Sequence, residues 1–313
     1  MTELSRFLVV IDPTADAHPA LDRAAWFARQ VDAELELFIC YYNQYISGEP
    51  FFDSKGLQKA REEALGNSKK LLNKLAAPFV KEGLKVTTDA AWDNPLDEGI
   101  VRKVMRSAPD IVFKDTHYHS KLRRAFFTNT DWNLIRTCPA PLYLVKAYTW
   151  SEENRVIAAV DPVHQHGKPA ELDTRILDLA GALASAVKGE THVFHAVNLY
   201  DSATNVAAPE PTMLTVGNVA EDVRKWHAEE LDKLLQAYAL PESQVHVREG
   251  HAEKLLPELA TELDAALVIM GAVARNPLQR IFIGSTAEKV MDALPCDLLV
   301  VKPVWFSSPV SSE

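Results

Sequence analysis

The chain has 313 residues, of which 47% are hydrophobic and 24% are charged, and its formal net charge is −10. This length predicts about two domains, and the ordinary apolar fraction excludes a disordered chain. The longest apolar runs cover only a few residues, whereas a membrane-spanning helix needs about 20. The N-terminus has no apolar core of the signal-peptide kind. Three scattered cysteines favour a reduced, cytoplasmic setting.

The two halves of the chain differ in charge. Residues 1–150 hold 20 Lys and Arg against 19 Asp and Glu, whereas residues 151–313 hold 13 against 24. Nucleic-acid binding depends largely on basic side chains that neutralise phosphates. The only short basic run, residues 121–124, is typical of a solvated surface. We therefore expect no direct binding to nucleic acid.

Short apolar runs alternate with helix-length segments along the whole chain. In chain order, the runs that predict strands are 6–11, 35–40, 84–89, 110–114 and 142–146, then 155–160, 191–197, 244–248, 266–270 and 298–302. They are rich in Val, Leu and Ile without polar alternation, which is typical of strands covered on both faces. The longest helix of the second half is predicted at 216–239, with Val223, Trp226 and Leu231 on one apolar face. Alternation of strand and helix predicts parallel sheets with right-handed crossovers.

The second half repeats the first. Residues 6–13 resemble residues 155–162, and both segments end an apolar run with Asp-Pro. From about Val31 onward the halves align at a constant offset of 156 residues, so that 141–146 meets 297–302. We therefore predict two copies of one fold, at 1–149 and 154–306.

One segment of the second half has the features of an anion-binding site. Gly271 ends the fourth predicted strand, where open α/β sheets bind ligands. Gly284, Ser285 and Thr286 follow at the predicted start of a helix, and Ser285 has capping-box spacing to Glu288. Free backbone N–H groups and the helix dipole favour an anion there. Phosphate is the natural ligand for this arrangement.

The segment resembles the ATP-binding signature of the universal stress protein superfamily, Gly-x2-Gly-x9-Gly-[Ser/Thr]. In this chain it reads Gly271-x2-Ala274-x9-Gly284-Ser285. The resemblance implies two tandem adenine-nucleotide α-hydrolase-like domains. Each would be a five-stranded parallel sheet of order 3-2-1-4-5 with helices on both faces. It also implies that Asp161 lies beside the nucleotide and that the adenine lies near Ala196.

Ala274 departs from this signature. A left-handed backbone at that position would cost an alanine about 1–2 kcal/mol, or roughly tenfold in affinity. This would weaken binding without abolishing it. Arg275 lies in the same loop and offers a charge to a phosphate, although a solvated loop arginine explains it equally well.

The first half has lost the signature. Asp115, Tyr118, Thr128 and Asn129 occupy the positions of the three glycines and the hydroxyl residue. Asp115 would repel a phosphate, and Tyr118 would add bulk. We expect this half to bind no ATP in the family manner, although Thr128 or Asn129 can still cap a helix.

Neither metal binding nor catalysis is predicted. His117 with His119, and His164 with His166, have His-x-His spacing, but no further ligand is evident for zinc. No phosphate loop of the Gly-x4-Gly-Lys type, nucleophile elbow or His-Glu-x2-His helix occurs.

The sequence therefore favours a non-enzymatic, cytoplasmic stress-response protein whose second domain binds ATP or a related nucleotide. The resemblance further implies resistance to DNA-damaging agents. It also implies an internal pseudo-dimer through the strands at 141–146 and 297–302, with homodimerisation as a further option. Two alternatives remain open. One is a carrier or sensor of an amphiphilic anion, bound near Phe126 and Phe127, and the other is a weak ATPase.

Overall fold

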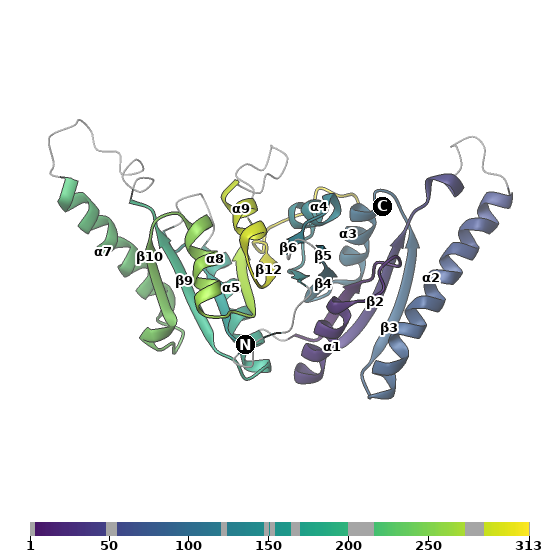
Figure 1. Cartoon of the computed structure of the whole chain (residues 1–313), viewed down its shortest axis with the longest axis horizontal. Coiled ribbons are helices and arrows are strands. Elements are labelled where there is room, and N and C mark those ends of the chain that lie inside the picture. Colours follow the sequence, from purple (N-terminus) through teal and green to yellow (C-terminus); the bar gives the residue numbers. More distant parts are fainter. Residues whose placement is uncertain are drawn as a thin grey trace. The chain divides into compact units, whose positions relative to one another are not determined.

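The computed structural model divides the chain into two compact units (Figure 1). The first unit is Glu3–Tyr148 together with Phe306–Glu313, and the second is Thr149–Trp305 with the two N-terminal residues. The structure describes residues 4–47, 55–119, 124–146, 150, 154–163, 170–199, 216–272 and 285–312.

The first unit is built on a five-stranded parallel sheet. Its strands pair in the order β3-β2-β1-β4-β7. A short antiparallel pair, β5 with β6, follows β4 and was not predicted. The elements are β1 (Arg6–Val10), α1 (Pro19–Val31), β2 (Glu34–Tyr41), η1 (Gln44–Ile46), α2 (Lys55–Lys81), β3 (Val86–Trp92), α3 (Leu96–Ser107), β4 (Ile111–Asp115), β5 (His117–His119), β6 (Arg124–Phe126), α4 (Asn129–Thr137) and β7 (Leu142–Val145).

The second unit repeats this arrangement. Its parallel strands pair in the order β10-β9-β8-β11-β12. Every strand predicted from the sequence is present, with ends shifted by at most three residues. The elements are β8 (Val156–Ala159), α5 (Ala170–Ala186), β9 (Thr191–Val197), α7 (Val216–Leu235), η2 (Glu242–Gln244), β10 (Val245–Glu249), α8 (Ala252–Glu262), β11 (Leu267–Gly271), α9 (Ser285–Ala293) and β12 (Asp297–Val301).

Helices cover both faces of each sheet, as right-handed crossovers require. In the second unit, α5 packs on β8, β9, β11 and β12, and Tyr238, just after α7, donates a hydrogen bond to Asp178 of α5 (3.0 Å). Helices α5 and α7 therefore share one face. Helices α8 and α9 contact each other. They lie on the opposite face, because strands β9 and β10 are added on one side of β8, whereas β11 and β12 are added on its other side.

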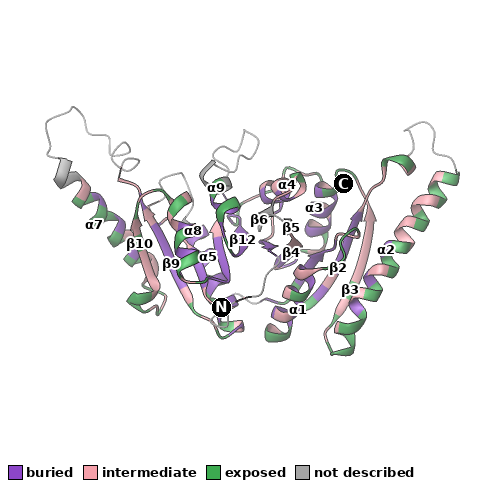
Figure 2. Ribbon diagram, viewed as in Figure 1, coloured by how far each residue is buried: buried purple, intermediate pink, exposed green. Residues whose placement is uncertain are grey.

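The central strands are buried on both sides, which explains their lack of polar alternation (Figure 2). In the first unit an aromatic cluster connects the sheet to α1. Phe113 stacks on Tyr143 with ring centroids 4.7 Å apart, and it meets Phe7 edge-on at 5.2 Å. Phe27 of α1 lies 6.0 Å from Tyr143. All four side chains are fully buried, so this cluster forms the core beneath α1.

The apolar face predicted for α7 is partly wrong. Val223 and Leu231 are buried as expected, but Trp226 is 40% exposed. The buried position between them belongs to His227, which is fully inaccessible. Residues 223, 227 and 231 are spaced by four, so they follow one side of the helix. A histidine therefore faces the core at a position where hydropathy predicts solvent.

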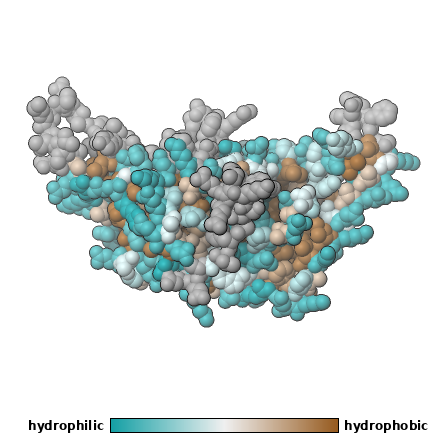
Figure 3. Space-filling model, in the orientation of Figure 1, coloured by the Kyte–Doolittle hydropathy of each residue, from teal (hydrophilic) through white to brown (hydrophobic). Residues whose placement is uncertain are grey.

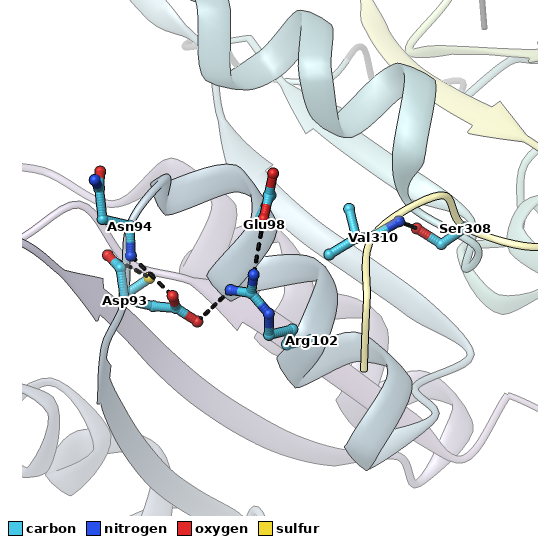
Figure 4. A network of polar contacts seen from close by, with 7 residues as sticks. Asp93, Asn94, Glu98, Arg102, Ser308 and Val310 are labelled. Atoms are coloured by element: carbon cyan, nitrogen blue, oxygen red, sulfur yellow. Dashed lines mark hydrogen bonds and ion pairs between the residues drawn. The ribbon is translucent and has the colours of Figure 1, made fainter. Parts of the chain in front are cut away.

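The C-terminal residues lie against the first unit, beside α3 (Figure 4). Arg102 of α3 pairs there with Asp93 and with Glu98, at 2.7 Å in each case. The backbone N–H of Val310 donates to the Ser308 hydroxyl (3.2 Å). The sequence repeat did not predict that the end of the chain joins the first unit.

The visible surface is mostly hydrophilic, with apolar areas on both units (Figure 3). The large exposed apolar side chains among the described residues include Tyr45, Trp226 and Val247. Among the described residues, no helix has the combined length and hydrophobicity that crossing a bilayer requires.

Candidate functional site

Three predicted site residues come together at the carboxyl edge of the second sheet. Ala159 of β8 is level with Phe194 of β9 and with Met270 of β11. Two residues further along, Asp161 is therefore level with Ala196, and Gly271 lies one residue before that level. The strand order places β8 between β9 and β11. This is the switch point at which successive crossovers go to opposite faces, and open α/β sheets bind ligands there.

The remaining predicted site residues are only partly described. Ala274, Arg275 and Gly284 lie outside the described residues. Ser285 and Thr286 are the first two residues of α9, and nothing is described of their side chains. The helix start predicted at Gly284–Thr286 is confirmed, because α9 begins at Ser285.

The backbone around Asp161 is fixed from two directions. Its N–H donates to Oδ1 of Asp173, a fully buried carboxylate of α5 (3.1 Å). The carbonyl of the preceding residue, Val160, lies 3.2 Å from Nδ1 of His195. Both contacts are made to groups on the α5 and α7 face of the sheet, so Asp161 leaves β8 in a defined direction.

His195 belongs to a buried pair of histidines that the sequence analysis missed. Its Nε2 lies 2.7 Å from Nδ1 of His227 on α7, and the two rings stack with centroids 5.0 Å apart. At most 1% of either residue is exposed. The pKa of His227 is lowered to about 4, first of all by burial and then by the neighbouring His195, whereas Asp161 opposes the shift. His227 is therefore neutral at pH 7.

A second contact from α5 lies at the same edge of the sheet, at the end of β12. Arg175 of α5 donates through Nη1 to the carbonyl of Lys302, just after β12 (2.7 Å). Burial lowers the pKa of Arg175. Lys302 is itself only 2% exposed. Helix α5 therefore holds the ends of both β8 and β12.

The equivalent edge of the first unit is built differently. Asp115 ends β4, and its Oδ1 accepts the backbone N–H of Ala20 in the first turn of α1 (2.6 Å). Its Oδ2 is buried and has no hydrogen-bond partner in the described part of the chain. Burial raises the pKa of Asp115 to about 7, although the Ala20 N–H and the charge of Lys114 oppose this. The carboxyl group expected to repel a phosphate thus already contacts a helix N-terminus.

The helix that follows retains its cap. Thr128 is the N-cap of α4, and it forms a complete capping box with Asp131. Asp131 is fully buried and pairs with Lys114 of β4 (2.6 Å). The prediction that Thr128 can cap a helix is confirmed. The carboxylate of Asp131 occupies the helix start that would otherwise attract an anion.

No group of three potential metal ligands gathers within the described residues. His117 and His119 lie in β5, and nothing is described of their side chains. His164 and His166 lie outside the described part of the chain. The three cysteines are buried and form no disulfide within the described residues, and burial raises the pKa of Cys40 to about 12.

Comparison with known proteins identifies the class. The model of the universal stress protein family matches residues 3–146 and again residues 154–302. The chain therefore belongs to the universal stress protein family, as two tandem copies. It is 30% identical to universal stress protein E of Escherichia coli (strain K12), over all of this chain and 98% of that protein. It is 27% identical to the universal stress protein E homolog of Haemophilus influenzae, over 96% of this chain and 98% of that one.

Solved structures show the same two-unit fold. A putative universal stress protein from Pseudomonas aeruginosa is 28% identical, with a TM-score of 0.74 over 96% of this chain and 94% of that chain. A universal stress protein from Archaeoglobus fulgidus is 16% identical, with a TM-score of 0.66 over 95% of this chain and 98% of that one. The second likeness concerns the fold alone.

Proposed function

We propose that this stress-response protein binds ATP or a related nucleotide through its second unit, without being an enzyme. The observation that carries the proposal is the meeting of Asp161, Ala196 and Gly271 at the switch point of the second sheet. Helix α9 starts at Ser285, shortly after β11. Its free N–H groups and its dipole favour the phosphates, and Gly284, Ser285 and Thr286 form the cradle. Asp161 and Ala196 border the nucleoside part, while Ala274 and Arg275 belong to the loop over the phosphates.

The first unit does not take part in nucleotide binding under this proposal. Its Asp115 carboxyl lies against the N-terminus of α1, and its Asp131 carboxylate lies against the N-terminus of α4. A bound phosphate would be repelled by the Asp131 carboxylate and would find the N–H of Ala20 already bound to Asp115. The sheet and the helices of this unit nevertheless persist, so its role is structural.

Calorimetric titration of the full chain with ATP tests the proposal. Gly284→Asp places a carboxylate in the phosphate cradle and should abolish the binding heat. Thr128→Asp makes the same change at the aligned position of the first unit. The new carboxylate lies beside that of Asp131, which accepts a hydrogen bond from the Thr128 hydroxyl in the natural chain (2.9 Å). This control should therefore lose some stability but bind ATP like the natural chain. Equal affinities for the natural chain and Gly284→Asp would refute the placement of the site.

The alternatives are outcomes of companion assays. Release of phosphate from ATP by the purified chain, lost in Gly284→Asp, would favour a weak ATPase. An amphiphilic anion that copurifies with the chain, while ATP gives no heat, would favour a carrier or sensor.

Membership of the family supports a proposal for the cellular role. We propose a cytoplasmic protein that supports survival under stress, including exposure to DNA-damaging agents, without direct contact with nucleic acid. The net charge of −10 disfavours such contact. A strain that lacks the protein should survive DNA damage less well, and the Gly284→Asp form should fail to restore survival.

A further inference from the structure

Two histidines of the second unit are buried in its core. His195 and His227 are both inaccessible to solvent. Buried polar groups cost free energy unless they are hydrogen-bonded. The pair meets this requirement through two consecutive hydrogen bonds. They end on the backbone carbonyl of Val160, at the carboxyl edge of the sheet where the nucleotide site is proposed.

The direction of each hydrogen bond follows from chemistry. A carbonyl oxygen can only accept, so Nδ1–H of His195 donates to Val160 O. In the neutral ring Nε2 of His195 then accepts, and Nδ1–H of His227 donates to it. The pKa of His227, lowered to about 4 chiefly by burial, keeps the His227 ring neutral at pH 7. The charged group that acts on His227 from the end of β8 is Asp161 itself.

We propose that His195 and His227 are positioning residues for Asp161, and that they hold the end of β8 in the conformation that receives the ligand. The hydrogen bonds run from His227 of α7 to His195 of β9 and on to the carbonyl of Val160. This carbonyl belongs to the peptide bond between Val160 and Asp161. The Asp173 carboxylate holds the N–H of that same peptide bond. Both polar groups of one peptide unit are thus fixed by buried side chains from two elements, β9 and α5, and α7 supports the first of them through His227.

This inference rests on the proposed nucleotide site, because Asp161 is one of its residues. The closing experiment therefore includes a measurement that needs no ligand. The protein also supplies a matched control on the same strand. His192 of β9 is 5% exposed and lies 3.0 Å from His246 of β10. It is three residues from His195, so it faces the other side of the sheet.

The ligand-free measurement is amide hydrogen exchange at Asp161 in the full chain. His227→Leu removes the donor to His195 and should speed exchange at this amide about fivefold, the effect of roughly one hydrogen bond. His227→Asn retains a donor close to the Nδ1 position and should restore most of the protection. His192→Leu should leave the Asp161 amide unchanged. Unchanged exchange in His227→Leu would overturn the inference whatever the chain binds.

The ligand measurement is the dissociation constant for ATP, compared in the same variants. His227→Leu should bind about fivefold more weakly, while His227→Asn and His192→Leu should bind like the natural chain. In an Asp161→Ala background, His227→Leu should cause no further loss, because the histidine acts through Asp161. Additive losses would overturn the positioning role. Altered exchange in a chain that binds no ATP would uphold the positioning of Asp161 and refute only the proposed function.

Discussion

Removal of the charge on Asp115 should stabilise the first unit at neutral and alkaline pH. The Asp115→Asn variant keeps an Oδ1 acceptor for the N–H of Ala20 but cannot ionise. In the natural chain the pKa of Asp115 is raised to about 7 from 3.8, first of all by burial. The folded state therefore binds this proton more tightly than the unfolded state does. Stability is full below pH 4 and falls as the pH rises through 7.

The magnitude follows from the shift. About three pKa units correspond to about 4 kcal/mol of stability lost over the whole window. Between pH 5 and pH 8 the advantage of Asp115→Asn over the natural chain should grow by about 3 kcal/mol.

Urea unfolding of both proteins at pH 5 and pH 8, followed by circular dichroism, measures this difference. Asp16→Asn removes an exposed carboxyl from the loop between β1 and α1, and it should shift stability by less than about 0.5 kcal/mol. An advantage of Asp115→Asn that is the same at both pH values would refute the buried, pH-sensitive carboxyl.

Three further predictions concern stability. The folded pKa of His227, about 4, lies below its unfolded value of 6.5, so its contribution is present above pH 6.5 and is lost as the pH falls toward 4. Acid urea unfolding should show a loss of about 3 kcal/mol that is absent in His227→Leu. Lys103→Met leaves Glu36 and Asp89 without their shared ammonium, which lies 2.5 and 2.9 Å from them, and it should cost about 2 kcal/mol in urea unfolding. Unchanged stability in Lys103→Met would contradict a half-buried ion-pair network. A Cβ on Gly99 would lie 2.6 Å from Asp93 Cβ, so Gly99→Ala should lower the melting temperature, at a cost of about 1–3 kcal/mol. Gly66→Ala, which meets nothing within 4 Å in helix α2, should raise it instead.

The family signature and the structure emphasise different residues of the site. The glycines and hydroxyl residues near Gly284 are readable from the sequence, because a fixed spacing encodes the loop and the helix start. Asp161 is readable too, since it ends an apolar strand. His195 and His227 are not readable, because 32 residues separate them and neither has a local pattern that signals a ligand edge.

The sequence alone determined the duplicated α/β architecture and the position of every main strand, because burial on both faces leaves an unbroken apolar run. It also determined that only the second copy retains the phosphate-binding pattern. Tertiary structure decided which polar groups meet: Asp115 with Ala20, His195 with His227, and Asp161 with Asp173. It also decided that the C-terminal residues join the first unit. These contacts depend on packing between distant segments, and the free energy of a buried polar group is set by the partner it finds there, which no local sequence pattern specifies.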